Sequence, residues 1–81
     1  MSNLAQIKVG EMARIKTIET DSGMKRRLWD LGMTKGTLIE VVQASPSGDP
    51  VAYRVRGTII AIRNCDAAKI QVVAKGVEMD D

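Results

Sequence analysis

The chain has 81 residues, no histidine, one cysteine and a formal net charge of +2. This length indicates a single domain over residues 1–81, close to the smallest that a hydrophobic core stabilises unaided, with an ordered core at about 7–74. The near-balanced charge argues against a nucleic-acid binder, and the lack of histidine excludes a histidine-activated nucleophile.

The first clear pattern is a strand over residues 12–18, in which apolar Ala13 and Ile15 alternate with basic residues. Residues 1–6 precede this strand as a loose lead-in. Residues 20–23 are small and polar and end it.

A short amphipathic helix is predicted next, over residues 22–31. Asp21 or Ser22 can cap its first turn, because their side-chain oxygens accept hydrogen bonds from unpaired backbone N–H groups. Gly32 can adopt the left-handed conformation that ends a helix, and Met33 supplies the apolar contact that often follows. The side chains expected to dock the helix recur at four and three residues: Met24, Leu28 and Leu31.

The rest of the chain is rich in strand formers. Gly36 permits a tight turn into a strand over residues 37–44, and residues 45–50 are dense in turn formers. Three more strands are predicted at residues 51–56, 59–63 and 70–73, joined by a Gly57-Thr58 turn and by a helical turn at 65–68 that Asn64 caps. Residues 75–81 form a frayed tail.

Five short strands with one short helix between strands 1 and 2 indicate a mainly β fold, a small and partly open barrel. Closing the sheet limits exposed strand edges and lets a short chain bury its core. With no phenylalanine, one tryptophan and one tyrosine, that core is expected to be aliphatic, with Tyr53 in it or on a groove wall.

The exposed face of the helix is the first candidate binding surface. At about 100° per residue, Trp29 lies about 140° from Met24, Arg26 points almost directly away from the core, and Arg27 falls at the edge of the apolar stripe. Trp–Arg clusters are typical of protein–protein hot spots, so Arg26, Arg27 and Trp29, with Met33 at the helix end, are expected to contact a partner. The alternative is that Trp29 folds over the barrel rim and Arg27 braces a loop.

The loop at residues 45–50 is the second candidate. Gly48, Asp49 and Pro50 shape a stiff projection between two strands, and loops on rigid scaffolds commonly bind partners. The alternative is a hairpin connection without a binding role.

Catalytic and metal chemistry find no support in the sequence. Carboxylates such as Asp21, Glu40, Asp49 and Asp66 show no sign of converging on a metal. Cys65 precedes an aspartate that disfavours its thiolate, so we expect a small buried hydrophobe there. We therefore expect no enzyme activity, no cofactor and no metal.

The chain resembles the FeoA family, small cytoplasmic companions of the bacterial ferrous-iron transporter FeoB. The resemblance runs from about Ile7 to Val73, with one departure at Lys35, where the family often has proline. It is carried, in this order and spacing, by Arg27-Leu28-x-x-Leu31-Gly32-Met33-x-x-Gly36, Gly48-Asp49-Pro50 and Ile60-Ala61-Ile62-Arg63. It implies an SH3-like barrel that docks on FeoB, near its GTP-binding domain, and modulates the transporter. Our hypothesis is that the helix with Arg26, Arg27 and Trp29 and the loop at residues 48–50 together form the docking surface.

The sequence also bears on cellular location and on rival functions. No run of eighteen apolar residues or secretion signal is present, and the single cysteine fits a reducing cytoplasm. One rival is a regulatory module acting in trans, like the SH3-like C-terminal domain of iron-dependent repressors. Another is an RNA-associated barrel, which two aromatics and balanced charge argue against. An arginine finger at Arg26 or Arg27 lacks any sign of phosphate geometry. Self-association stays open.

Overall fold

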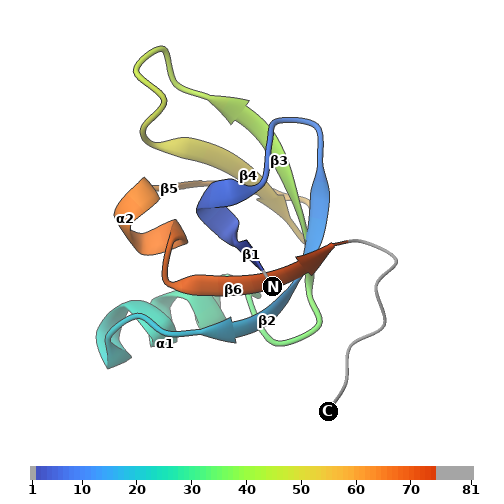
Figure 1. Cartoon of the computed structure of the whole chain (residues 1–81). Helices are drawn as coiled ribbons and strands as arrows, with labels where there is room; N and C mark the ends of the chain where they lie inside the picture. The colour runs from blue at the N-terminus through green and yellow to red at the C-terminus, as the bar shows by residue number, and fades with distance from the viewer. Residues whose placement is uncertain (1, 75–81) are drawn as a thin grey trace.

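The computed structural model describes residues 2–74, and the predicted tail at 75–81 lies outside them. Six antiparallel strands form one sheet in the order β1-β6-β2-β3-β4-β5, which curls around a single core (Figure 1). The strands are β1 (Ser2–Asn3), β2 (Met12–Ile18), β3 (Leu38–Ala44), β4 (Val51–Val55), β5 (Thr58–Ile62) and β6 (Ile70–Ala74). The helices are η1 (Leu4–Gln6, a 3₁₀ helix), α1 (Ser22–Asp30) and α2 (Asn64–Ala67).

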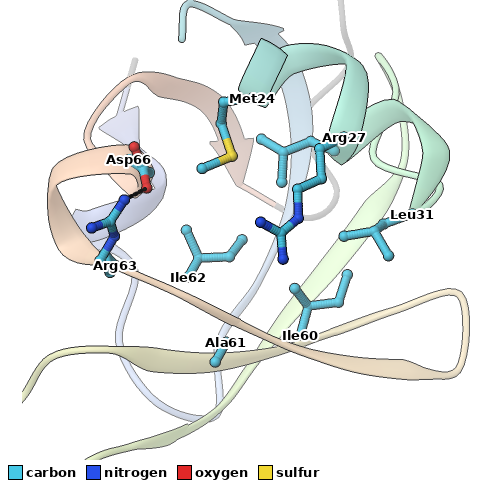
Figure 2. Close-up of a pocket in the computed structure, with 9 residues that line it drawn as sticks. Met24, Arg27, Leu31, Ile60, Ala61, Ile62, Arg63 and Asp66 are labelled. Atoms are coloured by element: carbon cyan, nitrogen blue, oxygen red, sulfur yellow. Dashed lines mark hydrogen bonds and ion pairs between the residues drawn. The ribbon is translucent and has the colours of Figure 1, made fainter. Parts of the chain in front are cut away.

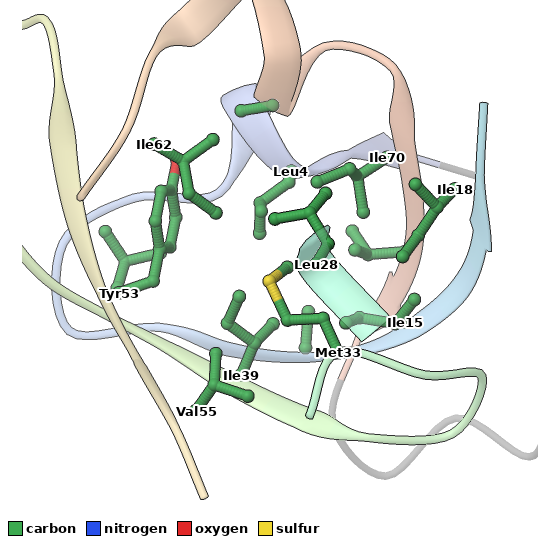
Figure 3. Packing of buried hydrophobic residues seen from close by; sticks show 14 residues of the cluster. Leu4, Ile15, Ile18, Leu28, Met33, Ile39, Tyr53, Val55, Ile62 and Ile70 are labelled. Atoms are coloured by element: carbon green, nitrogen blue, oxygen red, sulfur yellow. The ribbon is translucent and has the colours of Figure 1, made fainter. Parts of the chain in front are cut away.

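The core follows the alternation of the strands. In β2 the inward-facing residues Ala13 and Ile15 are fully buried, and in β3 Ile39 and Val41 are buried in the same way. The sulfur of Met33 and the side chain of Leu28 lie in the middle of this cluster (Figure 3). Tyr53 is the aromatic member of an otherwise aliphatic and methionine core, as the composition predicts.

Two short helices cover the gap between the edge strands. β1 and β5 are the two ends of the sheet order, and each is followed directly by a helix, η1 and α2 respectively. These helices contact each other and bury Leu4 and Ala67 completely. The barrel is therefore closed by side chains rather than by strand pairing, and both edge strands are shielded where they meet these helices.

The mainly β class and the small barrel are confirmed, with two differences of detail. The lead-in is not loose, because Ser2–Asn3 pairs with β6 and Leu4 fills the core. Residues 2–74 therefore form six strands rather than the predicted five, and α1 lies between β2 and β3. The β4–β5 turn is at Arg56-Gly57, one residue earlier than predicted, because Arg56 adopts a positive φ of 50° beside Gly57 at 82°. Within residues 2–74, no helix is long and apolar enough to cross a membrane.

Candidate docking surface

Helix α1 forms where the sequence predicts it. The Asp21 side chain caps it by accepting a hydrogen bond from the Met24 N–H at 3.0 Å. Gly32 ends it with a φ of +95°, and the Met33 N–H then donates to the Leu28 carbonyl at 2.9 Å. Because Leu28 is buried and Met24 packs against the core, the rest of the helix surface faces outward.

The outward face of α1 carries the predicted tryptophan. Trp29 is 50% exposed, and Lys25 Nζ lies 5.3 Å from the centre of its ring, a cation–π distance. Arg26 and Arg27 are exposed beside it. The expectation that Trp29 lies off the core-facing stripe is therefore confirmed.

A groove separates α1 from β2 on the tryptophan side. It measures about 380 Å³ and we call it the lysine groove. It is lined by Ile15, Lys16, Thr17, Ile18, Lys25, Trp29, Thr34 and Lys35. A register shift in β2 between Ile15 and Thr17 marks a β-bulge at Lys16, a device that re-aims side chains.

A second groove lies on the other side of α1, against β5 and α2. It measures about 270 Å³ and we call it the arginine groove; its lining is Met24, Arg27, Leu28, Leu31, Ile60, Ala61, Ile62, Arg63 and Asp66. Figure 2 shows Arg27 reaching from α1 toward Ile62 and Ile60 on its floor. Arg63 pairs with Asp66 within the groove, with 3.4 Å between Nη2 and Oδ2.

The loop at residues 45–50 uses its polar groups internally. Asp49 Oδ1 accepts a hydrogen bond from the Asn64 N–H at 2.9 Å, and the Asn64 side chain donates to the Gly48 carbonyl at 3.0 Å. The prediction that Asn64 caps the following helix is therefore wrong. Asn64 is the first residue of α2, and the Asp49 side chain supplies the acceptor at the helix start. Pro50 follows Asp49 through a cis peptide bond and is exposed.

The two predicted contact regions do not form one patch. Figure 1 shows α1 and the 45–50 loop at opposite ends of the molecule, with α2 between them. The sequence-based hypothesis treated them as parts of one docking surface. The structure instead brings Arg27 together with β5 and α2, and holds Gly48 and Asp49 against Asn64.

Three side chains differ from their predicted settings. Met33 is 0% exposed, so in this structure it belongs to the core and cannot contact a partner. Leu31, expected to dock α1, is 37% exposed at the mouth of the arginine groove, because the helix ends before it. Cys65 is exposed rather than buried, since α2 turns Ala67 inward instead.

Arg56 is a residue whose role the sequence analysis missed. Its Nε donates to the Gly32 carbonyl at 3.0 Å, and Nη2 lies 3.4 Å from Thr37 Oγ1. The φ of Gly32, +95°, favours glycine, and a Cβ there would come within 2.7 Å of Arg56 Cδ, so the Arg56 side chain would have to shift from this position. Arg56 thereby fixes the end of α1 against the β4–β5 turn. The only local signal is an arginine before a glycine, which does not indicate this contact.

Comparison with known proteins identifies relatives that match most of this chain. A family model described as the FeoA domain matches residues 2–74. A "Fe(2+) transport protein A/Fe(2+) transporter FeoB fusion protein" of Porphyromonas gingivalis is 36% identical over 69 residues. That alignment covers 85% of this chain but only 8% of the relative, so the chain spans a small part of the fusion protein's length.

Solved structures agree on the fold. The FeoA protein from Chlorobium tepidum matches with a TM-score of 0.88 at 27% identity, over 95% of this chain and 73% of that one. FeoA of Stenotrophomonas maltophilia, complexed with zinc and described as a prokaryotic SH3 domain protein, matches with a TM-score of 0.79 at 25% identity, over 89% of each chain. A manganese-dependent transcriptional repressor, 16% identical with a TM-score of 0.78 over 89% of this chain and 40% of that one, shares the fold alone.

Proposed function

This chain belongs to the FeoA family, and on that premise we propose that it is a non-catalytic accessory protein of bacterial ferrous iron uptake that docks on the FeoB transporter. Docking takes place in the cytoplasm, near the GTP-binding domain of FeoB, and modulates the transporter. The proposal needs only that the chain binds two conformations of FeoB with different affinity, which shifts the balance between them.

The observation that carries the proposal is the fusion relative. In Porphyromonas gingivalis a homologous domain belongs to the same polypeptide as FeoB. A linker holds two domains at an effective concentration of about millimolar, so a fused domain needs only a weak contact to stay in place. A FeoA domain that is not linked to FeoB needs a docking surface to achieve the same proximity.

Helix α1 is the surface that fits this role best. Trp29 is half-exposed beside exposed Arg26 and Arg27, the residue types that dominate binding energy at interfaces. We therefore centre the FeoB contact on α1. Gly48 and Asp49 already serve the fold through Asn64, so the 45–50 loop, Pro50 included, is proposed as a structural element rather than a docking one.

The test is an NMR titration with the soluble GTP-binding domain of the cognate FeoB, with and without a non-hydrolysable GTP analogue. We expect chemical-shift changes on α1 amides, little change at residues 45–50, and an affinity that depends on the nucleotide. Full-length FeoB in nanodiscs serves as the second probe, because a contact with its membrane portion would escape the first. Absence of binding to both probes would refute the proposal.

The second hypothesis is a regulatory module acting in trans on a repressor. Its support is the likeness to metal-dependent repressors, which is one of fold, so FeoB docking is favoured. Recovery of a helix-turn-helix protein and not FeoB with the tagged chain from its native host would reverse this preference.

A further inference from the structure

Strand β5 has one edge that no other strand covers. It is the last strand in the sheet order and, within residues 2–74, it pairs with β4 alone. Helix α2 follows its buried end at Ile62, whereas Thr58, Ile59 and Ala61 before that end are exposed. An uncovered strand edge presents N–H and C=O groups to which another extended chain can bond.

The geometry of the β4–β5 hairpin identifies the groups that face outward. Both residues of its turn have a positive φ, 50° and 82°, as in two-residue hairpins of type I′. The residues that flank such a turn, here Val55 and Thr58, exchange hydrogen bonds, and every second pair beyond them does the same. The register continues without a shift to the end of β5. The backbone N–H and C=O groups of Ile59 and Ala61 therefore point away from β4, and within residues 2–74 they have no other partner.

The composition of β5 does not protect this edge. Edge strands commonly carry lysine, proline or a bulge, each of which prevents pairing with another chain. Thr58–Ile62 has no charged residue and no proline, and its register with β4 is uninterrupted. The side chain of Ile59 is 51% exposed. An apolar edge without these protective features is suited to pairing with a partner.

The arginine groove lies beside the same strand, with Ile60 and Ile62 in its lining. It has a volume of about 270 Å³ and separates β5 from α1. Successive side chains of a strand point to opposite faces. An extended segment bonded to the edge of β5 would therefore direct every second side chain into this groove, and the others would lie on the face of Ile59, where cross-strand apolar contacts form.

The arginine groove also holds a cation, Arg27, that is not matched within residues 2–74. Figure 2 shows the Arg27 side chain reaching from α1 into the groove, where the ion pair joins Arg63 to Asp66 instead. Within the described residues, no ion pair or hydrogen bond involves the Arg27 side chain. A carboxylate on the incoming segment would give Arg27 a charge-assisted hydrogen bond.

We propose that an extended segment of the protein partner adds to the free edge of β5 as a further strand, with a carboxylate beside Arg27 and an apolar side chain on the floor of the arginine groove. The inference deepens the proposed function and rests on it, since it names how a segment of FeoB binds next to α1. Main-chain hydrogen bonds to Ile59 and Ala61 supply affinity, and the groove supplies specificity.

A second copy of this chain fits the edge less well than a segment of the partner. The edge strand of another copy, Thr58–Ile62, contains no acidic residue. Pairing of two such strands would satisfy the backbone groups but would bring no carboxylate from β5 to Arg27. A partner segment in which an acidic and an apolar residue point to the same face satisfies both the edge and the cation.

Amide hydrogen exchange tests the strand addition directly, because only the outward-facing N–H groups gain protection. The isotope-labelled chain is followed by NMR alone and with a saturating amount of the GTP-binding domain of FeoB. Exchange at Ile59 and Ala61 is expected to slow at least about tenfold, whereas the Ile60 amide, which already bonds to β4, should change less. For full-length FeoB in nanodiscs, exchange of the β5 segment is followed by mass spectrometry. Binding without added protection of Ile59 and Ala61 would overturn the inference.

Edge variants extend the test to affinity. Ala61→Pro removes an N–H that does not bond to β4, so the β4–β5 ladder is kept. Ile59→Lys introduces a charge at the edge and is the second variant, and Val9→Lys makes the same change at an exposed residue outside the arginine groove. FeoB binding is expected to weaken about tenfold in both edge variants and to change little in Val9→Lys. Circular dichroism confirms that the variants are folded, and equal binding by Ile59→Lys and Val9→Lys would contradict the inference.

A peptide probe separates the inference from the proposed function. The capped peptide Thr-Glu-Val-Leu-Thr places its glutamate and leucine on one face, and its glutamine analogue is the control for charge. If the chain does not bind FeoB but the glutamate peptide protects the Ile59 and Ala61 amides, the proposed function fails and the edge inference stands. If FeoB binds without protecting them, FeoB docking stands and the edge inference fails. Protection that rises with the concentration of the chain alone would assign the edge to a second copy and overturn the inference, as would protection by neither FeoB nor the peptide.

Discussion

Helix α1 and the 45–50 loop both join neighbouring strands of the sheet, yet they differ in where their functional groups go. The helix exposes side chains to solvent, whereas the loop uses its polar groups within the fold. The helix satisfies most of its backbone internally, buries Leu28 and leaves Trp29 half-exposed. The loop has no repeating backbone hydrogen bonds, so Asp49 and Gly48 are used to hold α2 through Asn64. A self-satisfied element can present side chains to a partner, whereas an irregular one first has to satisfy its own polar groups.

The largest expected effect is on stability, at the buried residue that follows the end of α1. Met33 is fully buried directly after Gly32, so Met33→Ala is expected to lower the free energy of unfolding by about 2–5 kcal/mol. Chemical denaturation followed by circular dichroism measures this. Met33→Leu keeps the volume and is the matched control, with an expected cost below about 1.5 kcal/mol. A small effect of the alanine variant on stability together with a loss of FeoB binding would restore Met33 as a contact residue.

Trp29→Ala tests the outward side of the comparison. Because the ring is half-exposed, its loss is expected to cost about 1 kcal/mol of stability or less. As the anchor of a docking surface, it is expected to weaken FeoB binding by about 2 kcal/mol, or about thirtyfold in Kd. Isothermal calorimetry measures the affinity, and Trp29→Phe, which keeps an aromatic ring, should lose less. Unchanged affinity in Trp29→Ala would move the docking surface away from α1.

Asp49→Ala tests the 45–50 loop, whose polar groups hold the fold. Removing the carboxylate that accepts from the Asn64 N–H is expected to cost about 1 kcal/mol of stability, while FeoB affinity stays unchanged. Asp49→Asn retains an acceptor oxygen in the same position and should keep most of the stability. If Asp49→Ala instead weakened FeoB binding at unchanged stability, the loop would have to be counted as a contact region.

Local sequence patterns predicted the parts of this comparison that depend on neighbours along the chain. The Asp21 cap, the Gly32 end and the phase of Trp29 each follow from residues within one or two helical turns. Alternation of apolar and polar residues likewise predicted the longer β strands. The strand β1 has only two residues, too few to show an alternating pattern.

The rest depends on contacts between distant segments. Asp49 meets Asn64 and Arg56 meets Gly32 across 15 and 24 residues, and neither pair leaves a local signature. The β4–β5 turn lies one residue before its predicted position because Arg56 has a positive φ, a conformation that an arginine in the sequence does not indicate. The lysine groove needs three segments to converge, and no spacing in the sequence shows that they do.

The smallest expected effect concerns the strand that the loop leads into. Burial, and secondarily the Asp49 carboxylate, raise the pKa of Tyr53 above its ordinary value of 10.0. Above about pH 10 the unfolded chain therefore releases a proton that the folded chain keeps, so this stabilising contribution is complete below pH 10 and is lost as the pH rises through the folded-state pKa. Tyr53→Phe removes the titrating group, and its unfolding free energy should fall less steeply between about pH 9 and about pH 11 than that of the wild-type chain. Because Asp49 adds to the raised pKa, Asp49→Asn should shift the tyrosinate absorbance titration of Tyr53 to lower pH; a titration that does not move would mean that the loop carboxylate lies too far from the ring to affect it.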